Sequence, residues 1–221
     1  MDFIIENLPI FFKGTMETLY MSVCSTLFAY VLGLPLGILV VITRKDGLAP
    51  LPKFNAILDW VINIGRSIPF LILMVALIPF TQAIVGKSIG PNAAMVSLVI
   101  ASTPFVARMV EGSLDEIDKG VIEAARTMGA TIWEIIYKVY LPEALPSLVR
   151  GVSITSIILI GYSAMGGACG AGGLGDIAIR FGYYKYQYDV MLITLVLLMI
   201  IVQVIQSLFN NIAKKIDKRL A

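Results

Sequence analysis

Between two long apolar runs, the chain reads Glu123-Ala124-Ala125-Arg126-Thr127-Met128-Gly129 and then, at positions 139–142, Val-Tyr-Leu-Pro. These residues belong to a charged segment, 108–150, which holds twelve of the thirty-two charged residues of the chain. Placing a charge within hydrocarbon is costly unless the charge is paired or reaches the interface. The segment is therefore expected to lie in water, where it can contact another molecule.

The composition of the chain is that of an integral membrane protein. Hydrophobic residues make up 58% of the sequence and charged residues only 14%, whereas about 25% of residues are charged in soluble domains. A helix needs about 20 residues to cross a bilayer, and it satisfies its own backbone hydrogen bonds there. Five runs of 20 to 26 residues contain no charge, which predicts an all-α membrane protein with about five spans: Thr18–Thr43, Ser67–Gly86, Ser88–Ala107, Gly151–Gly175 and Val190–Ala213.

The distribution of lysine and arginine predicts how the chain is oriented. Twelve of the seventeen lie in the first loop, in segment 108–150 or in the tail, four lie on the opposite side, and Arg66 is not assigned. Because cytoplasmic loops are enriched in these residues, we expect the N-terminus outside and the C-terminus in the cytoplasm. The predicted organisation is an outer segment 1–17, one transmembrane domain 18–213 with the cytoplasmic loop 108–150, and a cytoplasmic basic tail 214–221.

Local signals divide the cytoplasmic loop into two short helices. Asp118 is placed to cap a helix over Val121–Met128, which Gly129 can end in the left-handed conformation. Helical spacing puts four small or apolar residues on one face of that helix: Val121, Ala124, Ala125 and Met128.

The second helix of the loop starts at a capping box, Thr131-x-x-Glu134. Its apolar residues recur at helical spacing, and the helix is expected to stop before Pro142, with 143–146 leading into the fourth span. Charge and periodicity alone also fit an ordinary solvated helical hairpin. The residues expected on the apolar side are Ile132, Ile135, Ile136 and Val139.

The residues of this loop suit a docking element. Alanines at 124 and 125 leave no bulk, so the helix can enter a groove of a partner, and Glu123 near its start is favoured by the helix dipole. The spacing Glu-Ala-Ala-x3-Gly-x9-Val-x-Leu-Pro resembles the EAA loop of ABC-importer permeases, with Val139 in place of the usual Ile. The resemblance implies a docking site for an ATPase subunit, formed by Glu123, Ala124, Ala125, Arg126, Met128, Gly129, Leu141 and Pro142.

Further tracts resemble the methionine-importer permeases of bacteria. They are Arg66–Phe70, Pro104–Glu111, Met128–Thr131, Leu141–Pro146 and Gly161–Gly175. The resemblance implies a type I importer permease of the bacterial inner membrane that works as a homodimer by alternating access. It also implies two ABC ATPase subunits that consume ATP and Mg, and an extracytoplasmic methionine-binding protein. An importer for another small amino acid or a sulfur-containing analogue is an alternative, as is an ATP-independent channel or secondary carrier.

Four residues are candidates for the translocation pathway or its gate. Arg66 has two interpretations: it reaches the headgroups on the cytoplasmic side, or it lies inside the membrane domain beside the pathway. Tyr162, Ser163 and Met165 precede a glycine-rich segment, 166–175, that predicts irregular backbone or close helix approach at the outer end of the fourth span. Plain helix packing is the alternative role for these three.

Several classes of function are not indicated by the sequence. It has no histidine, no metal-ligand cluster, no nucleotide-binding motif and no nucleophile–base pair. No basic stripe with interleaved aromatic residues indicates nucleic-acid binding. The apolar spans are expected to contact membrane lipid. None of the five charge-free runs contains the acidic residue typical of an ion-coupled carrier. We therefore expect no enzyme activity and no cofactor in this chain, and an external source of energy.

Overall fold

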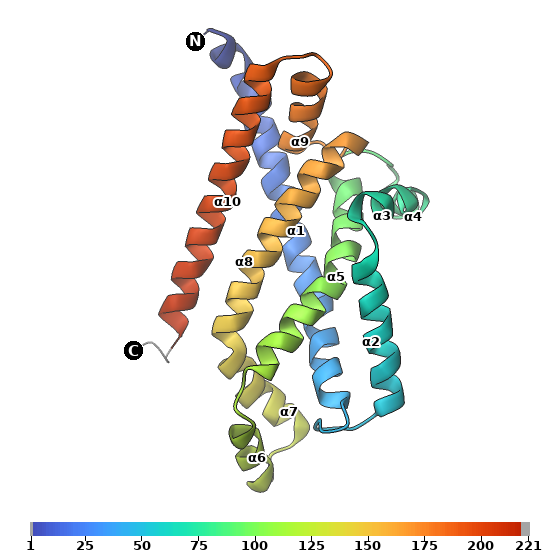
Figure 1. Cartoon of the computed structure of the whole chain (residues 1–221), viewed down its shortest axis with the longest axis vertical. Helices are drawn as coiled ribbons and strands as arrows, with labels where there is room; N and C mark the ends of the chain where they lie inside the picture. The colour runs from blue at the N-terminus through green and yellow to red at the C-terminus, as the bar shows by residue number, and fades with distance from the viewer. Residues whose placement is uncertain (1, 218–221) are drawn as a thin grey trace.

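The computed structural model describes residues 2–217, with the side chains of residues 8–217, and its regular structure there is helical throughout. Figure 1 shows an elongated bundle in which α6 and α7 form one end, called here the α6 end, while α9 lies near the far end. The helices are α1 (Asp2–Thr43), α2 (Pro52–Ser67), α3 (Phe70–Ala76), α4 (Ile78–Val85), α5 (Pro91–Asp115), α6 (Lys119–Thr127), α7 (Ile132–Ile135), α8 (Leu141–Gly166), α9 (Gly173–Ile177) and α10 (Tyr188–Ile216).

Helices α1 and α5 share the most extensive contact in the bundle. A Cβ at Gly33 would lie 2.7 Å from the Cβ of Val106, and one at Gly37 would lie 2.6 Å from the carbonyl oxygen of Ala107. Small residues four apart allow two helix backbones to approach in this way. Residues 8–17 continue α1, so the first helix runs without a break from the predicted outer segment into the first span.

The number of spans agrees with the prediction, but the second span was predicted in the wrong place. Within the described residues, four helical stretches are long and apolar enough to cross a membrane, and α2 and α3 pass the same test only as a pair, bent by 98°. The run Ser67–Gly86 is therefore not one helix. Pro69 cannot donate a helical hydrogen bond and disfavours helical geometry at Ile68, whose ψ is 124°. Helix α2, which precedes this run, supplies the length that the second span needs.

The helix expected to stop before Pro142 continues instead. Ile132–Cys169 forms one helical stretch, in which a π-helical turn, Ile136–Tyr140, joins α7 to α8. Pro142 lies in the first turn of α8, and Pro146 lies farther inside the same helix. A π turn changes the local hydrogen-bond pattern of a helix, and here it ends two residues before Pro142. The predicted break is therefore wrong.

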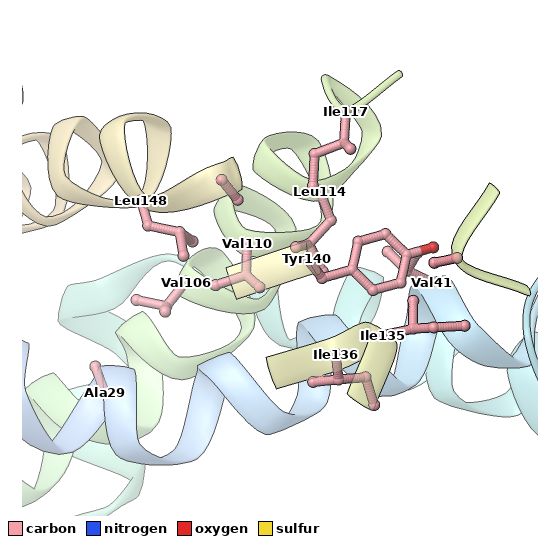
Figure 2. Packing of buried hydrophobic residues seen from close by; sticks show 12 residues of the cluster. Ala29, Val41, Val106, Val110, Leu114, Ile117, Ile135, Ile136, Tyr140 and Leu148 are labelled. Carbon is pink, nitrogen blue, oxygen red and sulfur yellow. The ribbon is translucent and has the colours of Figure 1, made fainter. Parts of the chain in front are cut away.

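The largest cluster of buried apolar side chains joins the loop helices to the spans. Figure 2 shows Val41 of α1, Val110 and Leu114 of α5, and Ile135 with Tyr140 of the loop packed against one another. Ile135 and Leu114 are at most 2% exposed. Burial of side chains of this size contributes about 1.5–3 kcal/mol each in water-soluble proteins. The loop is thus a packed part of the bundle.

The glycine-rich segment has the irregular backbone and the close approach that the sequence predicts. Gly170, Gly172 and Gly173 have φ between 76° and 85°, a region that costs other residues steric strain. The amide of Gly173 donates to the carboxylate of Glu17 at 2.8 Å, and the amide of Leu174 donates to the hydroxyl of Thr18 at 2.9 Å. These bonds attach the start of α9 to α1.

Candidate functional site: the loop between α5 and α8

Helix α6 protrudes at one end of the bundle and has the ends that the sequence predicts (Figure 1). The carboxylate of Asp118 accepts a hydrogen bond from the amide of Gly120 at 2.7 Å and so caps the helix. Gly129, just beyond it, has φ +81°, and a Cβ there would meet no atom within 4 Å. The side chain of Thr131 and the carboxylate of Glu134 then form the predicted capping box. Both turns of the loop are therefore fixed by local chemistry.

The apolar face predicted for this helix is divided between the core and the surface. Ala125 is 6% exposed and belongs to the core cluster, with Ile122 packed against that cluster. Val121, Ala124 and Met128 are exposed, and Met128 has 81% of its surface accessible. The four residues predicted on one face are therefore separated, because Ala125 packs in the core. The exposed surface of α6 therefore combines the small or apolar residues Val121 and Ala124 with the charged residues Glu123 and Arg126.

The other residues predicted for the docking site lie on α6 itself and at the start of α8. Glu123 and Arg126 are exposed, and both line a cavity of about 250 Å³ between α6 and the loop after α1. Leu141 is half-buried and packs against the core cluster, while Pro142 is exposed in the first turn of α8. The structure therefore brings the 123–129 group together at the protruding end and leaves 141–142 at the base of α8.

Two exposed aromatic residues beside α6 were not predicted. Trp133 is 76% exposed and Tyr137 is 72% exposed, four residues apart on the same stretch of helix. Large aromatic side chains contribute strongly to protein interfaces. Ile135 and Ile136 face the core and leave 133 and 137 on the opposite side, whereas Ile132, predicted on the apolar side with them, is exposed. Helical spacing from the two buried isoleucines is the sequence signal for this exposed pair. We add both residues to the candidate docking surface.

An ion-pair network connects the α6 end of the bundle to three spans. The carboxylate of Glu111 on α5 accepts hydrogen bonds from Arg44, which follows α1, and from Arg108 on α5. Arg108 also pairs with Asp59 of α2, and Arg44 with Asp115 at 2.8 Å. Burial alone would lower the pKa of Arg44, but hydrogen bonds and charges from Asp115 and Glu111 outweigh it and raise that pKa. The network holds α1, α2 and α5 together.

Replacing Glu111 by glutamine should destabilise the protein by about 3 kcal/mol, because it leaves two partly buried guanidinium groups without their shared carboxylate. The melting temperature of the purified protein should fall by about 10 °C. Asp46→Asn is the matched control, since the Lys119–Asp46 pair is 3.6 Å long and largely exposed and is worth less than about 1 kcal/mol. Equal melting temperatures for both variants would contradict a structural role for the network.

The four candidate pathway residues do not form one cluster. The ring of Tyr162 stacks on Phe70 of α3, with centroids 4.5 Å apart. Ser163 is 2% exposed and its hydroxyl donates to the carbonyl of Ile160, so it packs inside the bundle. Met165 is 53% exposed on α8. Arg66 is exposed in the last turn of α2, on a different element.

The chain is thus a multi-pass helical membrane subunit with a solvated, protruding loop, built like the permease subunits of type I ABC importers. It belongs to the family of inner-membrane components of binding-protein-dependent transport systems, whose profile matches residues 29–221. It is a transport subunit of the inner membrane and not an enzyme.

Individual relatives agree with this family over nearly the whole chain. The probable D-methionine transport system permease protein MetI of Vibrio cholerae is 47% identical over 96% of this chain and 95% of its own length. The methionine import system permease protein MetP of Bacillus subtilis is 48% identical over 94% of this chain and 93% of its own length.

Solved structures share the same architecture. The inward-facing MetNI methionine ABC transporter contains a chain with 48% identity and a TM-score of 0.95, covering 96% of this chain and 99% of that one. A chain of an amino acid ABC transporter crystallised with histidines has a TM-score of 0.75 at 20% identity, over 96% of both chains, and supports the fold alone.

Proposed function

We propose that this chain is the membrane permease of an ATP-driven methionine importer. The observation that carries the proposal is the near full-length identity, 47–48%, to permeases named for methionine transport. The amino acid ABC transporter crystallised with histidines is only 20% identical, so that likeness carries no argument about the substrate. The alternative is that this chain is the permease of an importer for another small amino acid or for a sulfur-containing analogue.

Helix α6 is the docking element for an ABC ATPase subunit. It protrudes, it exposes Val121, Ala124 and Met128, and Trp133 and Tyr137 beside it add aromatic surface. An ABC ATPase acts as a pair of subunits, so two copies of this chain related by a two-fold axis would supply two docking elements. ATP and Mg are then used by the partner ATPases, and an extracytoplasmic binding protein delivers the substrate.

Transport proceeds by alternating access, with α6 as the point at which ATPase motion enters the membrane domain. Helix α5 leads into α6 within four residues, and the network around Glu111 joins α5 to α1 and α2. A movement of α6 therefore displaces three spans together, as packed helices shift as rigid bodies. In this arrangement the α6 end faces the cytoplasm and the N-terminus lies outside. The predicted basic tail extends past the last described residue, and 218–221 lie outside the described residues.

The gate involves the C-terminal end of α8, which is the end farther from α6. Met165 is exposed on the protomer, and Tyr162 is fixed by its stack on Phe70. Because the methionine side chain is flexible and apolar, it can move into and out of a narrow pathway at little cost in free energy. Ser163, being buried, is assigned a packing role.

Uptake by the reconstituted complex tests the proposed function. The chain is co-purified with an ABC ATPase from the same organism that binds it, reconstituted into liposomes and supplied with a methionine-binding protein from that organism. Labelled methionine should accumulate only with ATP and the binding protein, and unlabelled methionine should compete better than other amino acids. Accumulation without ATP would show a channel or secondary carrier, whereas better competition by another amino acid would overturn the methionine assignment.

A further inference from the structure

Helix α10 carries a polar stripe over its C-terminal half. Gln203, Gln206 and Asn210 follow one another at spacings of three and four residues, so they share one side of the helix, and Ser207 lies beside them. All four side chains are exposed, and within the described residues none of them makes a hydrogen bond. Leu208, on another side of the helix, is exposed and apolar. This half of α10 is therefore amphipathic.

The stripe begins near the middle of the hydrocarbon layer. Gln203 lies thirteen residues from Val190 and ten from Ala213, the two ends of the last charge-free run. At the rise of a helix these separations are about 20 Å and about 15 Å, and the hydrocarbon layer is about 30 Å thick. Gln206 lies only about 5 Å farther along the helix. An amide without a hydrogen-bond partner is strongly unfavourable at this depth, so the stripe does not face lipid.

The stripe points away from the bundle to which α10 belongs. Each residue advances a helix by about 100°, so Gln203 lies about 180° round α10 from Thr194 and about 200° from Ile201, both of which are buried. Helix α10 is the least buried of the four long spans, and Figure 1 shows it at one edge of the bundle. No described part of this chain covers the stripe, so its partner comes from another molecule.

The opposite edge of the bundle, formed by α2, carries exposed residues at a matching spacing (Figure 1). Along α2 the intervals are four, three and four residues: Ala56, Trp60, Asn63 and Ser67. Along α10 the same intervals separate four exposed residues: Met199, Gln203, Gln206 and Asn210. Alternating intervals of three and four residues are typical of the contact between two packed helices. Both edges therefore have the pattern of a helix–helix seam.

The polar groups of the two edges are complementary. The amide of Asn63 donates to the carboxylate of Asp59 at 3.2 Å, and the hydroxyl of Ser67 donates to the carbonyl of Asn63 at 2.8 Å. Asn63 thus keeps a second N–H, and the oxygen of Ser67 can still accept. A glutamine side chain offers donors and an acceptor, so Gln203 and Gln206 can bond to either residue. Polar side chains inside membrane spans commonly join helices in this way.

We propose that α10 of one copy of this chain packs against α2 of a second copy, with Gln203, Gln206 and Asn210 in the seam between them. When two copies face each other across a two-fold axis parallel to the spans, the α10 edge of one protomer lies beside the α2 edge of its partner, and the reverse. The dimer then has two identical seams that enclose the space around the axis. The proposal rests on the proposed homodimer and names the surface that holds it together.

Cross-linking between cysteines tests the seam in the complex with the ATPase. In a variant without the two native cysteines, Gln203→Cys is combined in turn with Asn63→Cys and with Ser67→Cys, and the complex in liposomes is treated with bis-maleimidoethane. At least one pair should convert most of the chains to a covalent permease dimer on a denaturing gel. Leu208→Cys, exposed about 140° round α10 from Gln203, is the matched control and should give no dimer with either partner cysteine.

Replacing Gln203 by leucine measures what its amide contributes to association. Loss of one interhelical hydrogen bond at each of the two seams should weaken self-association of the fluorescently labelled permease in liposomes about tenfold. Single-molecule photobleaching counts the fraction of dimers. Leu208→Ala should leave that fraction unchanged, and both variants should keep the wild-type helix content. Unchanged association of Gln203→Leu would overturn the role of the amide in the seam.

The outcomes separate the seam from the proposed function. The native mass of the complex shows how many copies of the permease it holds, and a single copy would overturn the proposed homodimer together with the seam. A two-copy complex in which neither pair is cross-linked would overturn the seam alone. Dimers formed by Gln203→Cys without a partner cysteine would also overturn it, because they would place α10 against α10. If methionine is not taken up, the substrate assignment fails while the cross-links still test the seam.

Discussion

Replacing Ala124 by tryptophan is expected to lower ATP-dependent uptake about 100-fold, equivalent to about 2.7 kcal/mol. Ala124 is exposed on α6, so a large side chain there meets no other part of the protomer. If α6 seats in a groove of the ATPase, the indole occupies space that the groove needs, and the complex cannot close. The measurements are uptake in proteoliposomes and the amount of ATPase that co-purifies with the permease.

The control for Ala124 has to separate docking from folding. Lys87→Trp adds the same bulk at an exposed position in the loop between α4 and α5, and it should leave both uptake and ATPase recovery unchanged. Both variants should melt at the wild-type temperature when the permease is purified alone. Normal ATPase recovery with Ala124→Trp would show that α6 is not the contact surface.

Replacing Gly175 by valine is expected to prevent recovery of the folded chain. A Cβ at Gly175 would lie 2.3 Å from the carbonyl oxygen of Ala164 and 2.4 Å from its Cα. Neither atom belongs to a flexible side chain, so α9 would have to move away from α8. Overpacking of this kind costs about 3 kcal/mol or more when backbone must shift. Size-exclusion chromatography of a fluorescent fusion measures the folded yield.

Gly161→Val makes the matched comparison on α8. A Cβ at Gly161 meets no atom within 4 Å, and valine has a better helix propensity than glycine by a few tenths of a kcal/mol. The yield of folded protein should therefore equal that of the wild type or exceed it. Equal yields for the two variants would mean that α9 is not held against α8 as the structure has it.

The sequence predicted most of the spans because of how charges are distributed. Runs without charge correspond to α1, α5, α8 and α10, since hydrocarbon excludes unpaired ionic groups. The same criterion failed for the second span, because Asp59 and Arg66 interrupt α2. Asp59 is tolerated through its pair with Arg108, 49 residues away, and no local pattern reveals such a partner.

Prediction of the candidate site was limited in the same way. The cap at Asp118 and the box at Thr131 depend on neighbours within three residues, so the sequence predicts them directly. The burial of Ala125 depends on contacts with the core cluster, which includes α1 and α5. Helical spacing alone places it on the same face as Ala124. The residues 123–142 therefore remain predicted contacts, with Trp133 and Tyr137 added from their exposure.

Helix α8 gives the molecule a long lever. At the rise of an α-helix, its 26 residues extend about 39 Å, from beside the loop to the level of Met165. A tilt of about 5° around its foot would swing the far tip by about 3 Å, the rise of two helical residues. Small rotations at one surface of the membrane can thus become side-chain-sized openings at the other.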